Sequence, residues 1–316
     1  MPHLSQADKE TEGRADIAVC RLAFAVLSYA ITFAAPTWAD VDGLELTDKT
    51  RDAELSHEIG HPTATLLSAF FGLDNNLPLL SRLICRGAPG MDGMPVIFST
   101  EIDHSTLQVS DFQVTTSSGA TGEPHCVTLL PATDAGELRT VLLVGEFGTA
   151  ATDPPVSVEI VSHLHSIDGL LDFRGAQVAV TPLAEGPSLI LADIVDPTTP
   201  DLGLGQRRTD GDDCPLVGIR QAVRVVWAGG VTLANGDEPG DAARELYRVV
   251  VRAVDGTERE ITPAALADLG DGDNNHVLCL DAADTAVSVS FPAGVLIDPN
   301  DDLNPATSVA VRPTQP

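Results

Sequence analysis

The sequence has almost no lysine. Lys9 and Lys49 are the only two among its 316 residues, and 46 acidic residues stand against 18 lysines and arginines. The formal net charge of −28 gives a surface that repels polyanions, so we exclude nucleic acid and anionic lipid as partners. This charge is typical of an acidic, soluble, exported protein. The alternative is a dedicated cation-binding surface.

Motifs of several common enzyme classes are missing as well. The sequence contains no Gly-x-Ser-x-Gly elbow, no phosphate-binding loop and no Cys-x-x-Cys pair. Serine hydrolase, nucleotide-binding and thiol-redox functions therefore lack support.

The body of the chain also lacks an apolar run of the ~20 residues that a membrane span needs. Near the N-terminus, Arg21 precedes a 14-residue apolar run from Leu22 to Ala35, and the small residue Ala39 follows shortly after. This pattern predicts an export signal over residues 1–39, cleaved after Ala39. We expect no membrane span in the mature chain, which would be secreted, periplasmic or at the cell surface. An uncleaved N-terminal anchor is the alternative.

One stretch of the chain occurs twice. The segment from Val287 to Pro313 aligns without a gap to the segment from Val156 to Pro182, 131 residues earlier. The identities lie in two alternating apolar blocks, whereas the middle differs, as expected for two strands joined by a variable loop. The mature chain is therefore predicted to be one unit used twice.

The spacing of short apolar runs favours β-structure throughout. Runs punctuated by Gly, Pro and Asp indicate β-sandwiches rather than a parallel α/β sheet. We predict an acidic N-terminal tail over residues 40–61, a first sandwich over 62–184 and a second over 185–316. One helix is expected from Pro263 to Leu269, with Thr262 as its N-cap.

The cysteines fit export. Cys20 would leave with the signal, and an even number in an exported chain predicts two disulfides. The repeat assigns one bridge to each unit, and the remaining four cysteines then pair as Cys85–Cys126 and Cys214–Cys279. Four reduced, buried cysteines are the alternative.

A family resemblance begins in the first unit. A strand ending in Phe98-Ser99 precedes a turn at Ile102-Asp103, then Thr106-Leu107 and a second strand at Asp111-Phe112. This order resembles the opening of bacterial immunoglobulin-like domains of the S-layer type. The segments Pro292 to Gly294 and Asp298 to Asn304 are similar to the Pro-Ala-Gly and Asp-rich passage in which such domains tend to end.

The resemblance implies two tandem immunoglobulin-like β-sandwiches. It also implies a surface or extracellular spacer, adhesion or ligand-presenting module without catalytic residues. Its partner would be a protein or glycan ligand at the cell surface, which the sequence does not identify.

The rival function comes from the segment HEIGH. His57, Glu58 and His61 have the HExxH spacing, in which a helix holds zinc with two histidines and uses the glutamate as a general base. Such a site would make the protein a zinc-dependent hydrolase resembling a metallopeptidase. Against it, Pro62 disfavours a helical conformation at His61. We therefore predict a non-enzymatic module and keep the hydrolase as the alternative.

Two acidic loops are candidate calcium sites, because both place hard oxygen ligands at alternate positions. The candidate ligands are Asp298, Asn300, Asp302 and Asn304 in one loop, and Asp271, Asp273 and Asn275 in the other. Solvated turns rich in Asp and Asn are the alternative. His163 and His165, together with His57 and His61, form a further candidate site, for copper or zinc.

Overall fold

The computed structural model describes residues 49–50, 64–195, 213–215 and 217–313. Within them the fold is all-β, as predicted. The helices of this part of the chain are the short 3-10 turns η1 (Leu79–Leu83), η2 (Val109–Asp111) and η3 (Asp241–Leu246). None of these described helices is long and apolar enough to cross a membrane. The predicted export signal and most of the acidic tail lie outside the described residues.

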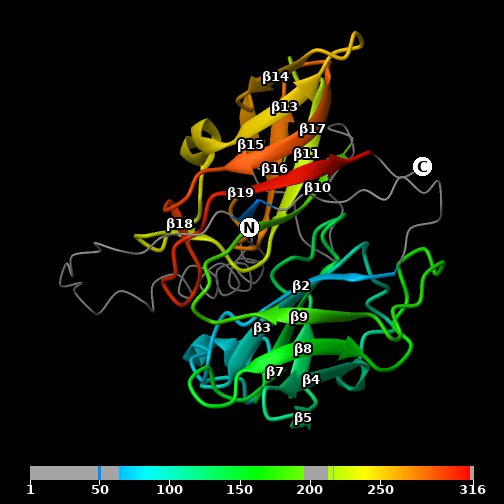
Figure 1. The fold of residues 1–316 in the computed structure, drawn as a ribbon, viewed down its shortest axis with the longest axis vertical. Coiled ribbons are helices and arrows are strands. Elements are labelled where there is room, and N and C mark those ends of the chain that lie inside the picture. Colours follow the sequence, from blue (N-terminus) through cyan, green and yellow to red (C-terminus); the bar gives the residue numbers. More distant parts are fainter. Residues whose placement is uncertain (1–48, 51–63, 196–212, 216, 314–316) are drawn as a thin grey trace, which may run out of the picture.

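Two large sheets share the described strands (Figure 1). The first, which we call unit one, has the strand order β5-β4-β8-β9-β2-β3-β7-β6. Its strands are β2 (Leu66–Phe70), β3 (Asp92–Phe98), β4 (Phe112–Thr116), β5 (Thr121–Gly122), β6 (Cys126–Thr128), β7 (Thr140–Gly145), β8 (Pro155–Ile160) and β9 (Gln177–Thr181).

The second sheet, which we call unit two, has the order β14-β13-β17-β19-β10-β11-β16-β15. Its strands are β10 (Leu189–Val195), β11 (Gln221–Trp227), β13 (Arg248–Arg252), β14 (Glu258–Ile261), β15 (Ala265–Ala267), β16 (Asn275–Leu280), β17 (Thr285–Phe291) and β19 (Thr307–Arg312). In addition, β1 (Lys49–Thr50) pairs with β19, and β12 (Thr232–Leu233) pairs with β18 (Leu296–Ile297).

The two strand orders correspond position by position, so the sequence repeat is also a topological repeat. Val158 pairs with Val178 in unit one, and their counterparts Val289 and Val309 pair in unit two. The chain passes from the first sheet to the second between Thr181, at the end of β9, and Leu189, at the start of β10. The domain limits given for the mature chain stay predictions.

The first strand of each unit joins the two halves of a curled sheet. Strand β2 pairs antiparallel with β3 and parallel with β9, and β10 does the same with β11 and β19. Both strands carry a register shift at the same place, after Leu66 and after Leu189. Such a bulge bends a strand, which lets it pair with a different partner at each end.

The cores of the two units differ at corresponding positions. In unit one the rings of Phe98 and Phe112 meet edge to face. In unit two the corresponding residues are Trp227 and Tyr247, and Trp227 Nε1 donates a 3.0 Å hydrogen bond to the Tyr247 hydroxyl. That hydroxyl lies 2.6 Å from Nδ1 of His276. Unit two thus buries a polar chain of three side chains where unit one is apolar.

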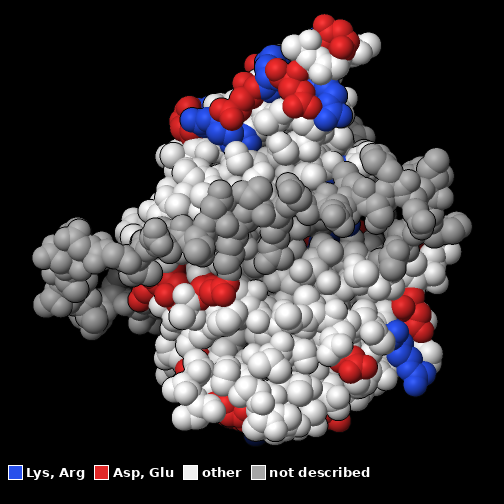
Figure 2. Space-filling view, in the orientation of Figure 1, with Lys and Arg blue, Asp and Glu red and all other residues white. Residues whose placement is uncertain are grey.

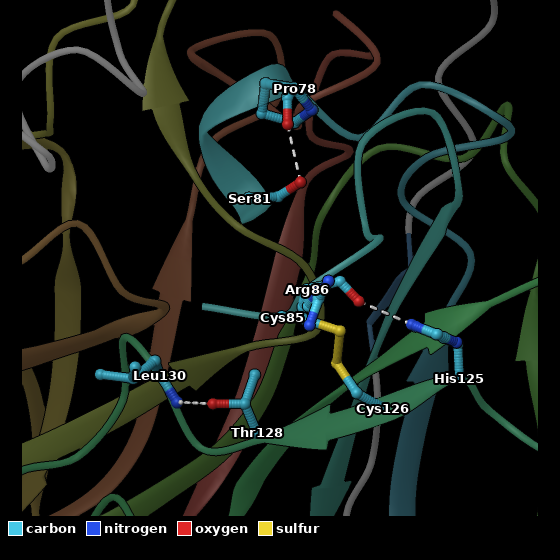
Figure 3. Close-up of a disulfide and its surroundings, with 8 residues drawn as sticks. All are labelled: Pro78, Ser81, Cys85, Arg86, His125, Cys126, Thr128 and Leu130. Carbon is cyan, nitrogen blue, oxygen red and sulfur yellow. Dashed lines mark hydrogen bonds between the residues drawn. A yellow bond between two sulfur atoms is a disulfide. The ribbon is translucent and has the colours of Figure 1, made fainter. Parts of the chain in front are cut away.

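Both predicted disulfides are present in the structure, Cys85–Cys126 and Cys214–Cys279. The first joins the loop after η1 to β6, beside a hydrogen bond of 2.8 Å between His125 Nε2 and the carbonyl of Arg86 (Figure 3). The second cysteine of each disulfide lies on a different strand in the two units. Cys126 lies on β6 opposite Val144 of β7, whereas Cys279 lies on β16 opposite Ala265 of β15. The bridge therefore attaches to neighbouring strands in the two units.

The predicted helix from Pro263 to Leu269 is wrong. Residues Ala265 to Ala267 form β15 and pair with β16, and Leu266 is buried in the core of unit two. The N-cap and proline signals are local, and they are overridden here by pairing with a buried strand.

The buried polar chain of unit two predicts a pH dependence. Burial lowers the pKa of His276 from 6.5 to about 4. Between pH 6.5 and pH 4 the histidine is protonated in the unfolded chain but stays neutral in the folded chain. The free energy of unfolding is therefore unaffected by this group above pH 6.5 and falls as the pH is lowered toward 4. We expect a loss on the order of 2–3 kcal/mol, measured by urea unfolding at pH 7.5 and pH 4.5.

The double variant Tyr247→Phe/His276→Val introduces the apolar residues that unit one has at the corresponding positions, Phe112 and Val141. It should lose the part of the acid sensitivity that comes from His276. Tyr247→Phe alone is the control, because it keeps the histidine and its titration. Equal pH dependence in the wild type and the double variant would contradict the assignment.

Candidate functional site

The two units meet through an apolar contact between equivalent strands. The side chains that they share in one buried cluster are Phe70, Ile97, Ile190, Leu191, Val226 and Ala228. Gly229 allows the approach, because a Cβ at this residue would lie 2.8 Å from the ring of Phe70. Phe70 is fully buried, so its ring has little room to move aside. We call this contact and its polar border the junction.

An ion-pair network borders the apolar contact. Asp193 on β10 receives a hydrogen bond of 2.8 Å from Arg139 of unit one, and 2.7 and 3.0 Å hydrogen bonds from Arg312 on β19. Arg312 also donates to the carbonyl of Ser99 in unit one, at 3.1 Å. Burial alone would raise the pKa of Asp193, but the hydrogen bonds from Arg312 and the charge of Arg139 outweigh it and lower the pKa. The carboxylate therefore stays ionised inside the junction.

A second polar group at the junction consists of carboxylates alone. Asp134 and Glu137 come from the β6–β7 loop, and Asp268 and Asp271 from the β15–β16 loop. These are corresponding loops of the two units. One carboxylate oxygen from each residue lies within 4.8 Å of the others. We call these four residues the junction carboxylates.

Two of the junction carboxylates, Glu137 and Asp271, lie in an environment that disfavours their charge. Burial, followed by the charges of Asp273 and Asp268, raises the pKa of Asp271 to about 9. Burial first, and then the same two aspartates, also raises the pKa of Glu137 well above its usual range. The nearby positive charge is Arg224, whose Nε lies 3.9 Å from Glu137 Oε1. One guanidinium does not balance several carboxylates, so the group requires protons or a bound cation.

The loop of Asp271 contains one of the predicted calcium sites. Asp271 accepts a hydrogen bond from the backbone N–H of Asp273, and Asp273 accepts hydrogen bonds of 2.7 and 2.6 Å from Asn275. Only Asp271 of the three predicted ligands is among the junction carboxylates. Asp134, Glu137 and Asp268 do not stand at alternate positions along one loop, so residue spacing did not predict them. Their signal was the correspondence of the two loops rather than the spacing along one of them.

The other predicted calcium loop is held by its own side chains. Asp298 Oδ1 accepts hydrogen bonds from the backbone N–H groups of Asn300 and Asp302. Asn304 Oδ1 accepts from Val295 and Leu296, and its amide group donates to the carbonyls of Pro292 and Pro305. Asn304 therefore serves the turn, and calcium at this loop stays a prediction.

The predicted zinc residues His57, Glu58 and His61 lie outside the described residues. His163 and His165 stack at 6.1 Å, and His163 Nδ1 lies 2.5 Å from the carboxylate of Asp172. His163 Nε2 lies 3.2 Å from Arg174. Both ring nitrogens of His163 therefore already have partners in the structure.

The surface in Figure 2 gathers charges of both signs at the end of unit two that carries β13 and β14. Three ion pairs lie there: Arg248–Glu260, Arg252–Glu258 and Arg259–Asp284. Exposed pairs of this kind contribute about 0–1 kcal/mol each. They contrast with the partly buried network around Asp193.

No family model matches the sequence, and no curated protein matches it. Among solved structures, the S-layer protein rSbsC(31-844) is 14% identical at a TM-score of 0.26, over 80% of this chain and 41% of that chain. Domains 1-6 of the surface layer protein SbsC are 11% identical at a TM-score of 0.26, over 80% of this chain and 55% of that chain.

This chain thus spans about half the length of those structures. At such TM-scores the likeness is weak and does not establish a common fold. These comparisons therefore do not assign the chain to a family, and none of them supports a metallopeptidase.

The ion-pair network predicts that Asp193→Asn destabilises the protein. The substitution leaves Arg139 and Arg312 without their carboxylate in a largely buried site, which we expect to cost about 2–4 kcal/mol in the free energy of unfolding. Denaturant unfolding measures the change. Asp284→Asn, which removes a surface pair with Arg259, is the control and should cost less than about 1 kcal/mol. A similar small effect for both variants would contradict the role assigned to Asp193.

Proposed function

We propose that the protein is an exported, non-enzymatic structural or binding module of the cell surface, built from two immunoglobulin-like units that behave as one rigid body. The observation that carries this proposal is the junction. Linked domains usually move relative to each other when their interface is small and polar. Here an apolar cluster and the network around Asp193 join the two units.

The chemistry of each unit supports an extracellular place. Disulfides persist in oxidising compartments and are rare in the cytosol, and each unit has one. A rigid pair of sandwiches holds its two ends at a fixed distance, as a spacer or a ligand-presenting module requires. The partner is a protein or a glycan at the cell surface.

Location is tested by brief protease treatment of intact source cells. Peptides from both units should be released before any cytosolic marker protein appears. Recovery of the protein only from the cytosolic fraction would contradict the proposal. Stoichiometric zinc, together with peptidase activity that Glu58→Gln abolishes, would instead establish the hydrolase.

Rigidity is tested at two adjacent glycines. Gly229→Ala places a methyl group against the buried ring of Phe70, so we expect the junction to loosen. Gly230→Ala is the matched control, because its nearest neighbour, a side-chain atom of Pro299, would be 3.7 Å away. Small-angle scattering should show a larger maximum dimension for the Gly229 variant only. Identical scattering curves for the two variants would argue against a junction set by this contact.

A further inference from the structure

Two buried oxygens of the junction carboxylates receive no hydrogen bond from the described protein groups. Glu137 is fully buried and Asp268 is 3% exposed. Within the described residues, Glu137 Oε1 and Asp268 Oδ2 have no hydrogen-bond partner. Glu137 Oε1 has only the 3.9 Å ion pair with Arg224 beside it. A buried carboxylate oxygen without a hydrogen bond is unfavourable, because water solvates the charge far better than the protein interior does. Side chains of this kind indicate that a ligand completes the site.

The spacing of the oxygens allows one cation to contact all four residues. Calcium binds oxygen at 2.3–2.6 Å, so ligands on opposite sides of the ion are roughly 4.6–5.2 Å apart. Magnesium binds at 2.0–2.1 Å and brings opposite ligands to about 4.0–4.2 Å. The junction oxygens lie within 4.8 Å of one another, so an ion of either size can reach all four residues. Calcium is favoured because this site is buried and built from protein oxygens, whereas magnesium loses its water reluctantly and usually keeps several water ligands.

The donor set also selects a hard cation. All four side chains are carboxylates, and the group contains neither histidine nor cysteine. Oxygen ligands of this kind favour calcium or magnesium over zinc and copper. Several negative charges beside the single positive charge of Arg224 favour a divalent ion over a monovalent one.

We propose that one calcium ion binds between the two units, held by Asp134 and Glu137 from unit one and by Asp268 and Asp271 from unit two. The ion joins the corresponding β6–β7 and β15–β16 loops and so fastens the junction at its charged border. Neither predicted calcium loop contains this set of ligands. The inference rests on the carboxylates alone and not on the proposed surface role.

The test compares thermal unfolding of the mature chain in CaCl₂, in MgCl₂ and in chelator. Calcium bound only by the folded chain should raise the Tm by about 3–6 °C. Magnesium should raise it less. Isothermal titration should detect a calcium site that the double variant Glu137→Gln/Asp268→Asn lacks.

The double variant has a second signature. In chelator, it should be at least as stable as the wild type, because two repelling carboxylates become neutral amides. In calcium, it should lose the Tm rise. If this variant fails to fold, Asp271→Asn at the less buried edge of the site takes its place. The control is Asp298→Asn/Asp302→Asn in the other acidic loop, which should keep the full calcium response.

Three results would overturn the proposal. They are an unchanged wild-type Tm between millimolar calcium and chelator, an equal or larger rise in magnesium, and a calcium response that survives in the Glu137/Asp268 variant. If the Tm rise in calcium is lost in the Asp298→Asn/Asp302→Asn variant instead, calcium binds the loop from Asp298 to Asn304 and not the junction. None of these outcomes bears on whether the junction is rigid in chelator, so the proposed function is tested separately.

Discussion

The close packing of β2 and β3 against β10 and β11 is the contact on which the arrangement of the two units depends. Phe70 packs where Gly229 has no side chain, and a β-carbon there would collide with the ring. The surrounding apolar cluster excludes water from the centre of the contact. Because the two units approach each other this closely, polar groups beside the contact are shielded from water and need partners inside the protein.

The two polar groups at the junction meet this demand in different ways. Asp193 has two arginines, one from each unit, and its pKa falls. The junction carboxylates have too little positive charge beside them, and burial raises the pKa values of Glu137 and Asp271. The charge of Asp193 is balanced by side chains of this protein, whereas the charge of the junction carboxylates is not. This difference is the physical reason for assigning a structural role to Asp193 and an ion-binding role to the junction carboxylates.

Much of the fold could be predicted because the sequence repeats. The match of Val156–Pro182 to Val287–Pro313 predicted the duplicated strands, and those strands pair in the same register. It also led to the right disulfide partners, although Cys126 and Cys279 occupy neighbouring strands rather than equivalent positions. The helix expected at Pro263 failed because capping signals are local and strand pairing is not.

The site was harder to predict, for a related reason. Alternate acidic residues along one loop drew attention to Asp271, Asp273 and Asn275. The group that the fold assembles takes one acidic pair from each unit, and the spacing within one loop does not show that the two pairs meet. Glu137 shows this most clearly, because only Asp134 is near it along the chain, and Asp268 and Asp271 meet it through the fold.

The central claim is that the two units form one rigid body. Spin labels attached through unnatural amino acids at the exposed positions Glu123 in unit one and Val254 in unit two would report on it by pulsed dipolar spectroscopy. A fixed junction predicts one narrow distance distribution. A broad distribution, like that of two domains on a flexible tether, would contradict the account.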